Sequence, residues 1–162
     1  MQHGEPVRRL PVFFAHAMHI RPYDFPDLEP LMALWERSVR ATHDFLGEAV
    51  IGQLVPVVRR HVFPVIETWV LVDRGDILGF VSLNGCKVEA LFVDPAHMGK
   101  GAGGRLLQHA RKLKGSPLTL DVNEQNPGAL AFYQKQGFTI TGRSPVDGMG
   151  LPFPLLHLAE PA

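Results

Sequence analysis

The stretch around which this sequence is organised reads VDPAHMGKGAGG, residues 93–104. It lies between an apolar, β-rich run and a segment of helical periodicity, and it is rich in glycine. Glycine adopts positive φ readily and lets backbone N–H groups approach a ligand closely. The N-terminus of the helix that follows carries a partial positive charge. The stretch therefore predicts a phosphate cradle built from the backbone of residues 98–104.

Hydrophobic periodicity outward from this loop predicts an α/β fold. The expected elements are a strand at 19–22, helices at 28–39 and 50–62, strands at 68–72, 77–83 and 86–93, a helix after the glycines, a strand at 118–122, a helix at 126–137, and strands at 138–142 and 155–159. Asp24 or Asp27 can cap the first helix. Pro56 interrupts the second helical pattern and predicts a kink or a late start there. We expect an α+β mixed sheet, mostly antiparallel, with helices on both faces and one right-handed βαβ crossover over residues 86–122.

Composition limits the classes of function. The 162 residues, 46% of them hydrophobic and 20% charged, suit one globular domain. Because 16 Lys and Arg balance 16 Asp and Glu, nothing indicates a nucleic-acid surface or a polybasic membrane anchor. The single Cys86 excludes an intrachain disulfide and a Cys-based zinc site, and the histidines form no H-E-x-x-H pair. Because these metal-binding patterns are absent, we expect no metal. No apolar run reaches the roughly 18 residues of a membrane helix, so we expect a cytoplasmic protein.

The first residues read differently from the rest of the chain. Two arginines followed by a short apolar stretch mimic a signal peptide. That stretch is shorter than the ~7–15 residues expected and contains Pro11. A regular strand–helix pattern begins only at Met18. We therefore expect residues 1–17 to be a flexible, dispensable extension and residues 18–162 to form a single domain.

Three interpretations of the glycine loop can be weighed from its spacing. A Walker P-loop needs G-x-x-x-x-G-K-[ST], which the sequence does not contain. Gly99, Gly101 and Gly104 satisfy G-x-G-x-x-G, and Asp121 follows about 20 residues on, as in a dinucleotide-binding fold. However, Asp94-Pro95 and three more residues separate the strand from the glycines. A glycine-rich turn that binds no ligand is the remaining alternative.

The loop also resembles the pyrophosphate loop of the GNAT superfamily of acetyl-CoA-dependent N-acetyltransferases, V-x-P-x-x-[QR]-x-x-G-x-[GA]. It departs from that pattern only at Met98, which stands at the Gln/Arg position. A second segment, NPGALAFYQKQGF at 126–138, resembles the family's N-x-x-A-x-x-x-Y-x-K-x-G-F. Both motifs stand in the family order, over roughly residues 18–159. Residues 38–46, 122–126, 142–144 and 152–156 further resemble a bacterial branch, the YjaB-type acetyltransferases.

The resemblance implies acetyl-CoA as cosubstrate. The loop backbone would bind the pyrophosphate, and the strand at 86–93 would pair with the pantetheine arm. A main-chain donor on that strand would polarise the thioester carbonyl, an effect typically worth ~10²–10³ in rate. Asn126 would bond the pantetheine amide as well as cap its helix. The residues implied to bind the cofactor are Leu91, Phe92, Val93, Met98, Gly99, Lys100, Gly101, Ala102, Gly103, Gly104, Asn126, Ala129, Phe132 and Tyr133.

The resemblance also implies a general acid, Tyr133, which would protonate the departing thiolate. Tyrosine has an unperturbed pKa of ~10 and so carries its proton at pH 7; the plainer alternative is a core tyrosine. Glu89 is the candidate base, because strand alternation would put it on one face with Lys87 and Leu91. Its alternative role is a surface carboxylate paired with Lys87. His43 is the rival base, since histidine titrates near ~6.5.

The acceptor pocket is expected between residues 42–46 and the loop at 146–154. The candidate substrate residues are His43, Phe45, Met149 and Phe153. The expected reaction is direct transfer of acetyl to a primary amine of a small molecule or a peptide, by a bacterial enzyme that can form a homodimer. A non-catalytic module that binds CoA is the alternative from another class.

Overall fold

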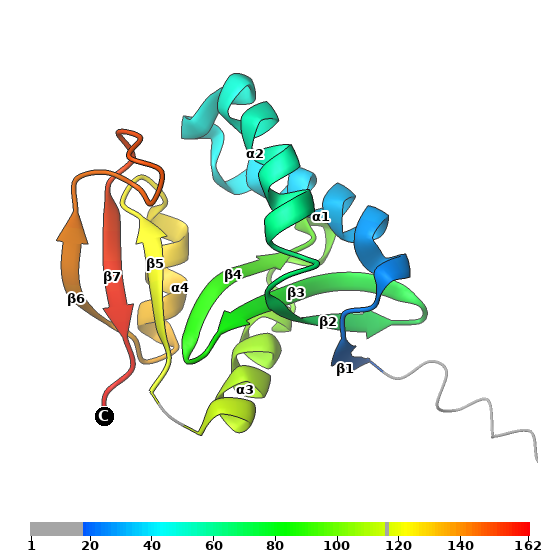
Figure 1. Ribbon diagram of the computed structural model, residues 1–162. Helices are drawn as coiled ribbons and strands as arrows, with labels where there is room; N and C mark the ends of the chain where they lie inside the picture. The colour runs from blue at the N-terminus through cyan, green and yellow to red at the C-terminus, as the bar shows by residue number, and fades with distance from the viewer. Residues whose placement is uncertain (1–17, 116) are drawn as a thin grey trace, which may run out of the picture.

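The computed structural model describes residues 18–115 and 117–162 (Figure 1). The expected N-terminal extension, residues 1–17, lies outside the described residues. Within these described residues, four helices and seven strands follow the predicted order, with short 3-10 turns at Phe25–Asp27, Asp44–Leu46 and Pro95–His97. The elements are β1 (His19–Pro22), α1 (Leu28–Thr42), α2 (Gly47–His61), β2 (Glu67–Asp73), β3 (Asp76–Asn84), β4 (Lys87–Val93), α3 (Ala102–Lys114), β5 (Thr119–Asn123), α4 (Pro127–Lys135), β6 (Thr139–Ser144) and β7 (Leu155–Ala159).

The described strands form one sheet in the order β1-β2-β3-β4-β5-β7-β6. Neighbouring strands are antiparallel except β4 and β5, which α3 connects in parallel. The predicted mixed sheet, with helices on both faces and one βαβ crossover, is therefore confirmed.

Each face of the sheet carries its own core. Val70, Val72 and Phe80 pack under α1 and α2 on one face, which we call the α1/α2 face. Leu71 and Val81, their alternating neighbours, pack under α3 and α4 on the other, the α3/α4 face. Figure 1 shows α1 and α2 over β2 to β4 only. In the described part of the chain, the β5-β7-β6 part of the α1/α2 face carries no helix.

Strands β4 and β5 separate soon after they meet. Their register contains two pairs, Lys87 with Thr119 and Val88 with Leu120. We call the point just beyond these pairs the vertex. A bulge lies at the same level, because β3 pairs with Ala90 and then with Val88, which leaves Glu89 as the extra residue.

This bulge corrects one prediction about β4. Simple alternation would put Lys87, Glu89 and Leu91 on one face. In the structure Leu91 packs with the α3/α4 core, whereas Lys87 pairs with Asp121 on the opposite face. The extra residue at Glu89 inverts the alternation, so Glu89 cannot share a face with both neighbours.

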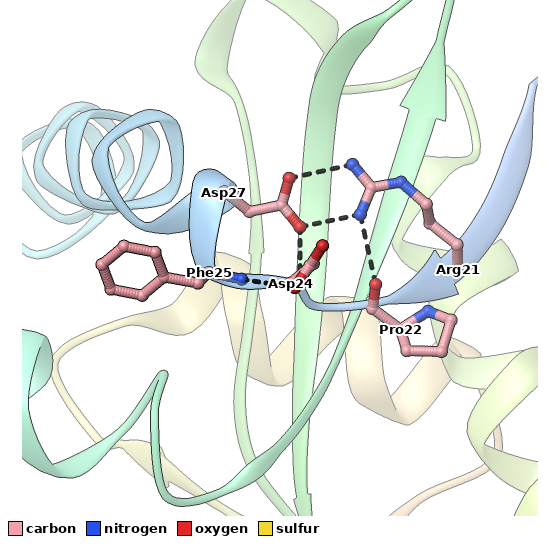
Figure 2. Close-up of polar contacts among 5 residues, drawn as sticks. All are labelled: Arg21, Pro22, Asp24, Phe25 and Asp27. Atoms are coloured by element: carbon pink, nitrogen blue, oxygen red, sulfur yellow. Dashed lines mark hydrogen bonds and ion pairs between the residues drawn. The ribbon is translucent and has the colours of Figure 1, made fainter.

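The start of α1 is held by a buried carboxylate (Figure 2). Asp24 accepts from the Phe25 N–H at 2.9 Å and so caps the preceding turn. Asp27 stands at the N-cap position of α1 but makes no side-chain cap to it. Instead, its carboxylate accepts from the Asp24 N–H at 2.8 Å and from the Arg21 guanidinium at 2.7 and 2.9 Å. Of the two residues predicted to cap α1, Asp24 caps the preceding 3-10 turn instead. Asp27 links β1 to that turn through its contacts with Arg21 and the Asp24 backbone.

Of the two alternatives predicted at Pro56, a kink or a late start, the structure excludes the late start. Helix α2 begins at Gly47 and includes Pro56. Ile51 and Val58, on either side of the proline, are both buried in the same core. Their burial stabilises the helix through the position where proline removes a hydrogen-bond donor.

Candidate functional site

The glycine loop has the geometry of an anion cradle. Gly99 and Gly101 have φ of +78° and +81°, which side chains with a Cβ rarely adopt. Gly101 is the N-cap of α3, and no side chain caps that helix. The first N–H groups of α3, beginning at Ala102, therefore lack intrahelical partners and can donate to a ligand. This fits a bound pyrophosphate, and the half-exposed Met98 side chain need not take part.

Gly103 has a packing role that sequence reasoning missed. A Cβ at Gly103 would lie 3.0 Å from the Cζ of Phe132 on α4. The missing side chain lets α3 approach α4 closely, so the loop and the helix that bears Tyr133 are held as one unit. Asn126 begins that helix, and its Oδ1 accepts from the Ala129 N–H at 3.1 Å. The predicted N-cap is confirmed, and the amide N–H₂ of Asn126 remains available as a donor.

Tyr133 is buried between α4 and the sheet. Its ring makes edge contacts with Phe132 and Phe138, at centroid distances of 5.1 and 5.6 Å. Burial raises the pKa of the phenol well above its usual value. The hydroxyl is therefore fully protonated at neutral pH, as a general acid must be before it acts.

The vertex is a point within the sheet, and the side chains of β4 beyond it alternate between the two faces. Leu91 and Val93 of β4 point toward the α3/α4 core, while Ala90 and Phe92 point toward α1 and α2. Glu89 is exposed at the bulge. The β4–β5 register ends at Val88, so beyond this pair the main chain of β4 is no longer paired with β5 and can meet a ligand in the gap.

An aromatic cluster closes the site on the α1/α2 face. His43 lies 5.5 Å from Phe45 and 5.9 Å from Phe92, and Phe45 lies 5.9 Å from Phe153, between ring centroids. Three of the four predicted substrate residues thus come together, from the α1–α2 turn and the β6–β7 loop. Met149 does not join these ring contacts; its side chain is 58% exposed. Phe92 was predicted to bind the cofactor through its main chain; the place of its side chain in this cluster was not predicted, because the bulge decides which way it points.

His43 lies in apolar surroundings. Burial lowers the pKa of its imidazole, and Nδ1 lies 2.7 Å from the Thr42 hydroxyl. A neutral imidazole is expected at pH 7. The His43 ring is therefore better suited to apolar contact with a substrate than to accepting a proton as a strong base.

A chain of polar side chains crosses the part of the α1/α2 face that carries no helix. Asp121 lies 3.1 Å from Lys87 Nζ through Oδ2 and 2.6 Å from His157 Nδ1 through Oδ1. His157 Nε2 lies 2.7 Å from the Ser144 hydroxyl. Burial alone would raise the pKa of Asp121, but the bonds to His157 and Lys87 outweigh it and hold this pKa below its usual range. The sequence analysis noted Asp121 only as part of the dinucleotide-binding alternative.

A backbone cradle, two parted strands and a buried tyrosine fit the class that the sequence resemblance implies, an acyltransferase that takes a phosphate-bearing acyl donor. Residues 64–140 match the acetyltransferase (GNAT) domain. The chain is 45% identical to the peptidyl-lysine N-acetyltransferase YjaB of Salmonella typhimurium, over 89% of this chain and 99% of that protein. It is 47% identical to Escherichia coli YjaB, over 81% and 88%. The chain therefore belongs to the GNAT family, and it is an N-acetyltransferase.

The fold agrees with solved relatives. The solution structure of apo-form YjaB from Escherichia coli superposes with a TM-score of 0.81 at 44% identity, covering 88% of this chain and 97% of that one. A GCN5-related N-acetyltransferase from Rhodopseudomonas palustris gives a TM-score of 0.77 at 21% identity, over 90% and 96%, which supports the fold alone. Among the described residues, no helix is long and apolar enough to cross a membrane.

Proposed function

We propose that the chain transfers acetyl from acetyl-CoA directly to the side-chain amine of a lysine in a peptide or protein. The peptidyl-lysine activity named for its YjaB relatives supports this class of acceptor. The observation that best supports the proposal is the parting of β4 from β5 after two pairs, beside a glycine loop whose helix packs closely on the helix that bears Tyr133. The aromatic cluster lies on the α1/α2 face.

The loop and β4 would hold the donor. Backbone N–H groups of residues 98–104 bind the pyrophosphate, and the main chain of residues 91–93 pairs with the pantetheine arm. When bound, acetyl-CoA supplies an activated acyl group. From Val93 back to Glu89 is about 13 Å of strand, so the arm brings the acyl end toward the vertex. A main-chain N–H of β4 at this level would polarise the acyl carbonyl.

Two side chains would move protons. Tyr133 donates to the departing sulfur, and its raised pKa ensures that the proton is present. Glu89 takes the proton of the acceptor ammonium through water, because it is exposed at the vertex. His43 is less suited to that role, since burial lowers its pKa and Thr42 engages Nδ1.

The aromatic cluster suits a lysine side chain. Phe45, Phe92 and Phe153 offer apolar contact for the aliphatic stem, and aromatic faces attract the ammonium group. The finer expectations of a bacterial cytoplasmic location and of a homodimer through the C-terminal strands remain proposals. No specific observation favours the non-catalytic CoA-binding module.

Replacing Tyr133 with Phe tests this proposal. We expect kcat toward a lysine peptide to fall by ~10²–10⁴, the usual contribution of a general acid, while the Kd for acetyl-CoA stays nearly constant. Tyr23→Phe is the matched control, because Tyr23 stacks on Phe63 away from the loop and should retain kcat. Thiol release and calorimetry measure the two quantities. An unchanged kcat would remove Tyr133 from the mechanism.

A further inference from the structure

The polar chain on the α1/α2 face ends in a primary amine. From β6 to β4 it runs Ser144, His157, Asp121 and Lys87, with successive distances of 2.7, 2.6 and 3.1 Å. Each residue comes from a different strand. This series of polar contacts therefore exists only in the folded sheet, and it orients the Asp121 carboxylate toward Lys87.

Lys87 and Asp121 flank the vertex. Lys87 belongs to the first β4–β5 pair, and Asp121 directly follows the last one. Both side chains lie on the α1/α2 face, to which Phe92 and the aromatic cluster also belong. The Lys87 side chain is 41% exposed and that of Asp121 is 26% exposed. A lysine amine of the chain itself thus stands on the acceptor side of the gap, beside a carboxylate.

We infer that Lys87 is an internal acceptor and that the protein acetylates it in an intramolecular reaction. The inference rests on the proposed function, because it uses the same donor site. The sequence has five lysines. Lys112 and Lys114 lie on α3, Lys135 lies on α4 and Lys100 lies in the glycine loop. Lys87 alone among them is held at the vertex by a carboxylate.

The reaction balances with groups already described. The Lys87 ammonium loses one proton to the Asp121 carboxylate, which passes it to water on the open face. Nζ then bonds to the acetyl carbonyl carbon and loses its second proton to solvent, the carbon–sulfur bond breaks, and CoA leaves as a thiolate that takes a proton from Tyr133. Tyr133 regains its proton from solvent. The products are acetyl-Lys87, free CoA and one released proton.

Peptide mass spectrometry of the full chain incubated with acetyl-CoA tests the inference. We expect about one acetyl group per chain, on Lys87, at a rate independent of protein concentration. Lys87→Arg should remove it, whereas Lys112→Arg should not. A rate that rises with protein concentration would overturn the intramolecular reaction. Unmodified Lys87 in a preparation that acetylates a lysine peptide would overturn the inference but leave the proposed function intact. Transfer to no amine would overturn both.

A second readout needs no acetyl-CoA. Labelling with an acetyl N-hydroxysuccinimide ester reports the intrinsic reactivity of each amine. Asp121→Asn should raise the labelling of Lys87 relative to Lys112, because the carboxylate no longer engages the amine in an ion pair. The same variant should slow acetylation by acetyl-CoA by ~10²-fold or more, since the proton acceptor is lost. Changes of the same sign in both reactions would overturn the role of Asp121.

Discussion

At the scale of single residues, Asp27 shows how one buried carboxylate joins two elements. It is 7% exposed and accepts from both Arg21 and the Asp24 backbone. The Arg21 hydrogen bonds hold the pKa of Asp27 below its usual range, although burial opposes them. A lowered pKa stabilises the folded state above the unfolded-state value of ~3.9, and this contribution is lost as the pH falls toward the folded-state pKa.

We therefore expect Asp27→Asn to lower the free energy of unfolding by about 1.5–3 kcal/mol at pH 7. The difference from wild type should shrink as the pH falls below ~4. Urea denaturation at several pH values measures it. Asp76→Asn, on an exposed residue of the β2–β3 hairpin, is the control and should change little. A difference that persists undiminished at low pH would contradict the role of the ionised carboxylate.

At the scale of elements, the contact between α3 and α4 joins the cradle to the acid. Two neighbouring glycines give a matched pair of substitutions. A Cβ at Gly103 would lie 3.0 Å from Phe132, whereas a Cβ at Gly104 would lie 3.5 Å from Gln136 Nε2, an ordinary contact. Overpacking typically costs ~1–3 kcal/mol, while Gly→Ala within a helix typically stabilises by ~0.5–1 kcal/mol.

The two alanine variants should therefore differ in sign. We expect Gly103→Ala to lower the free energy of unfolding and, by shifting α4 and Tyr133, also kcat. Gly104→Ala should stabilise the fold slightly. Thermal denaturation and steady-state kinetics distinguish them. Equal stability of the two variants would mean that Phe132 moves aside without cost.

At the scale of the whole molecule, the gap between β4 and β5 divides the sheet. Among the described strands, two register pairs join the β1–β4 part to the β5-β7-β6 part directly. A ligand lying in the gap would contact both parts, so its binding should stabilise the entire fold against unfolding.

Acetyl-CoA or CoA at 100 times its Kd should add about 2.7 kcal/mol of stability. For a domain of this size that raises Tm by roughly 5–10 °C. NAD at the same concentration should produce no shift. A differential scanning experiment with the three ligands in parallel gives the comparison. A shift with NAD alone would return the loop to the dinucleotide interpretation.

Local sequence determined most of the elements and one half of the site. The glycines of residues 98–104 specify a loop with positive φ, and Asn126-Pro127 specifies the start of α4, because both depend on the conformations of neighbouring residues. Strand and helix order follows from periodicity for the same reason. The motifs that carry the family resemblance therefore lie in segments whose geometry is local.

The tertiary structure decided the acceptor side. The bulge at Glu89 depends on the register between β3 and β4, and it reverses the side chains around it, which alternation within one strand cannot foretell. Asp121, His157 and Ser144 lie up to 36 residues apart and meet only because β5, β7 and β6 pair in that order. Likewise, the burial of Ile51 and Val58 on either side of Pro56 stabilises α2 at the position where the proline by itself predicted a kink or a late start. Such features depend on long-range pairing, because residues far apart in the chain meet only once the sheet has formed.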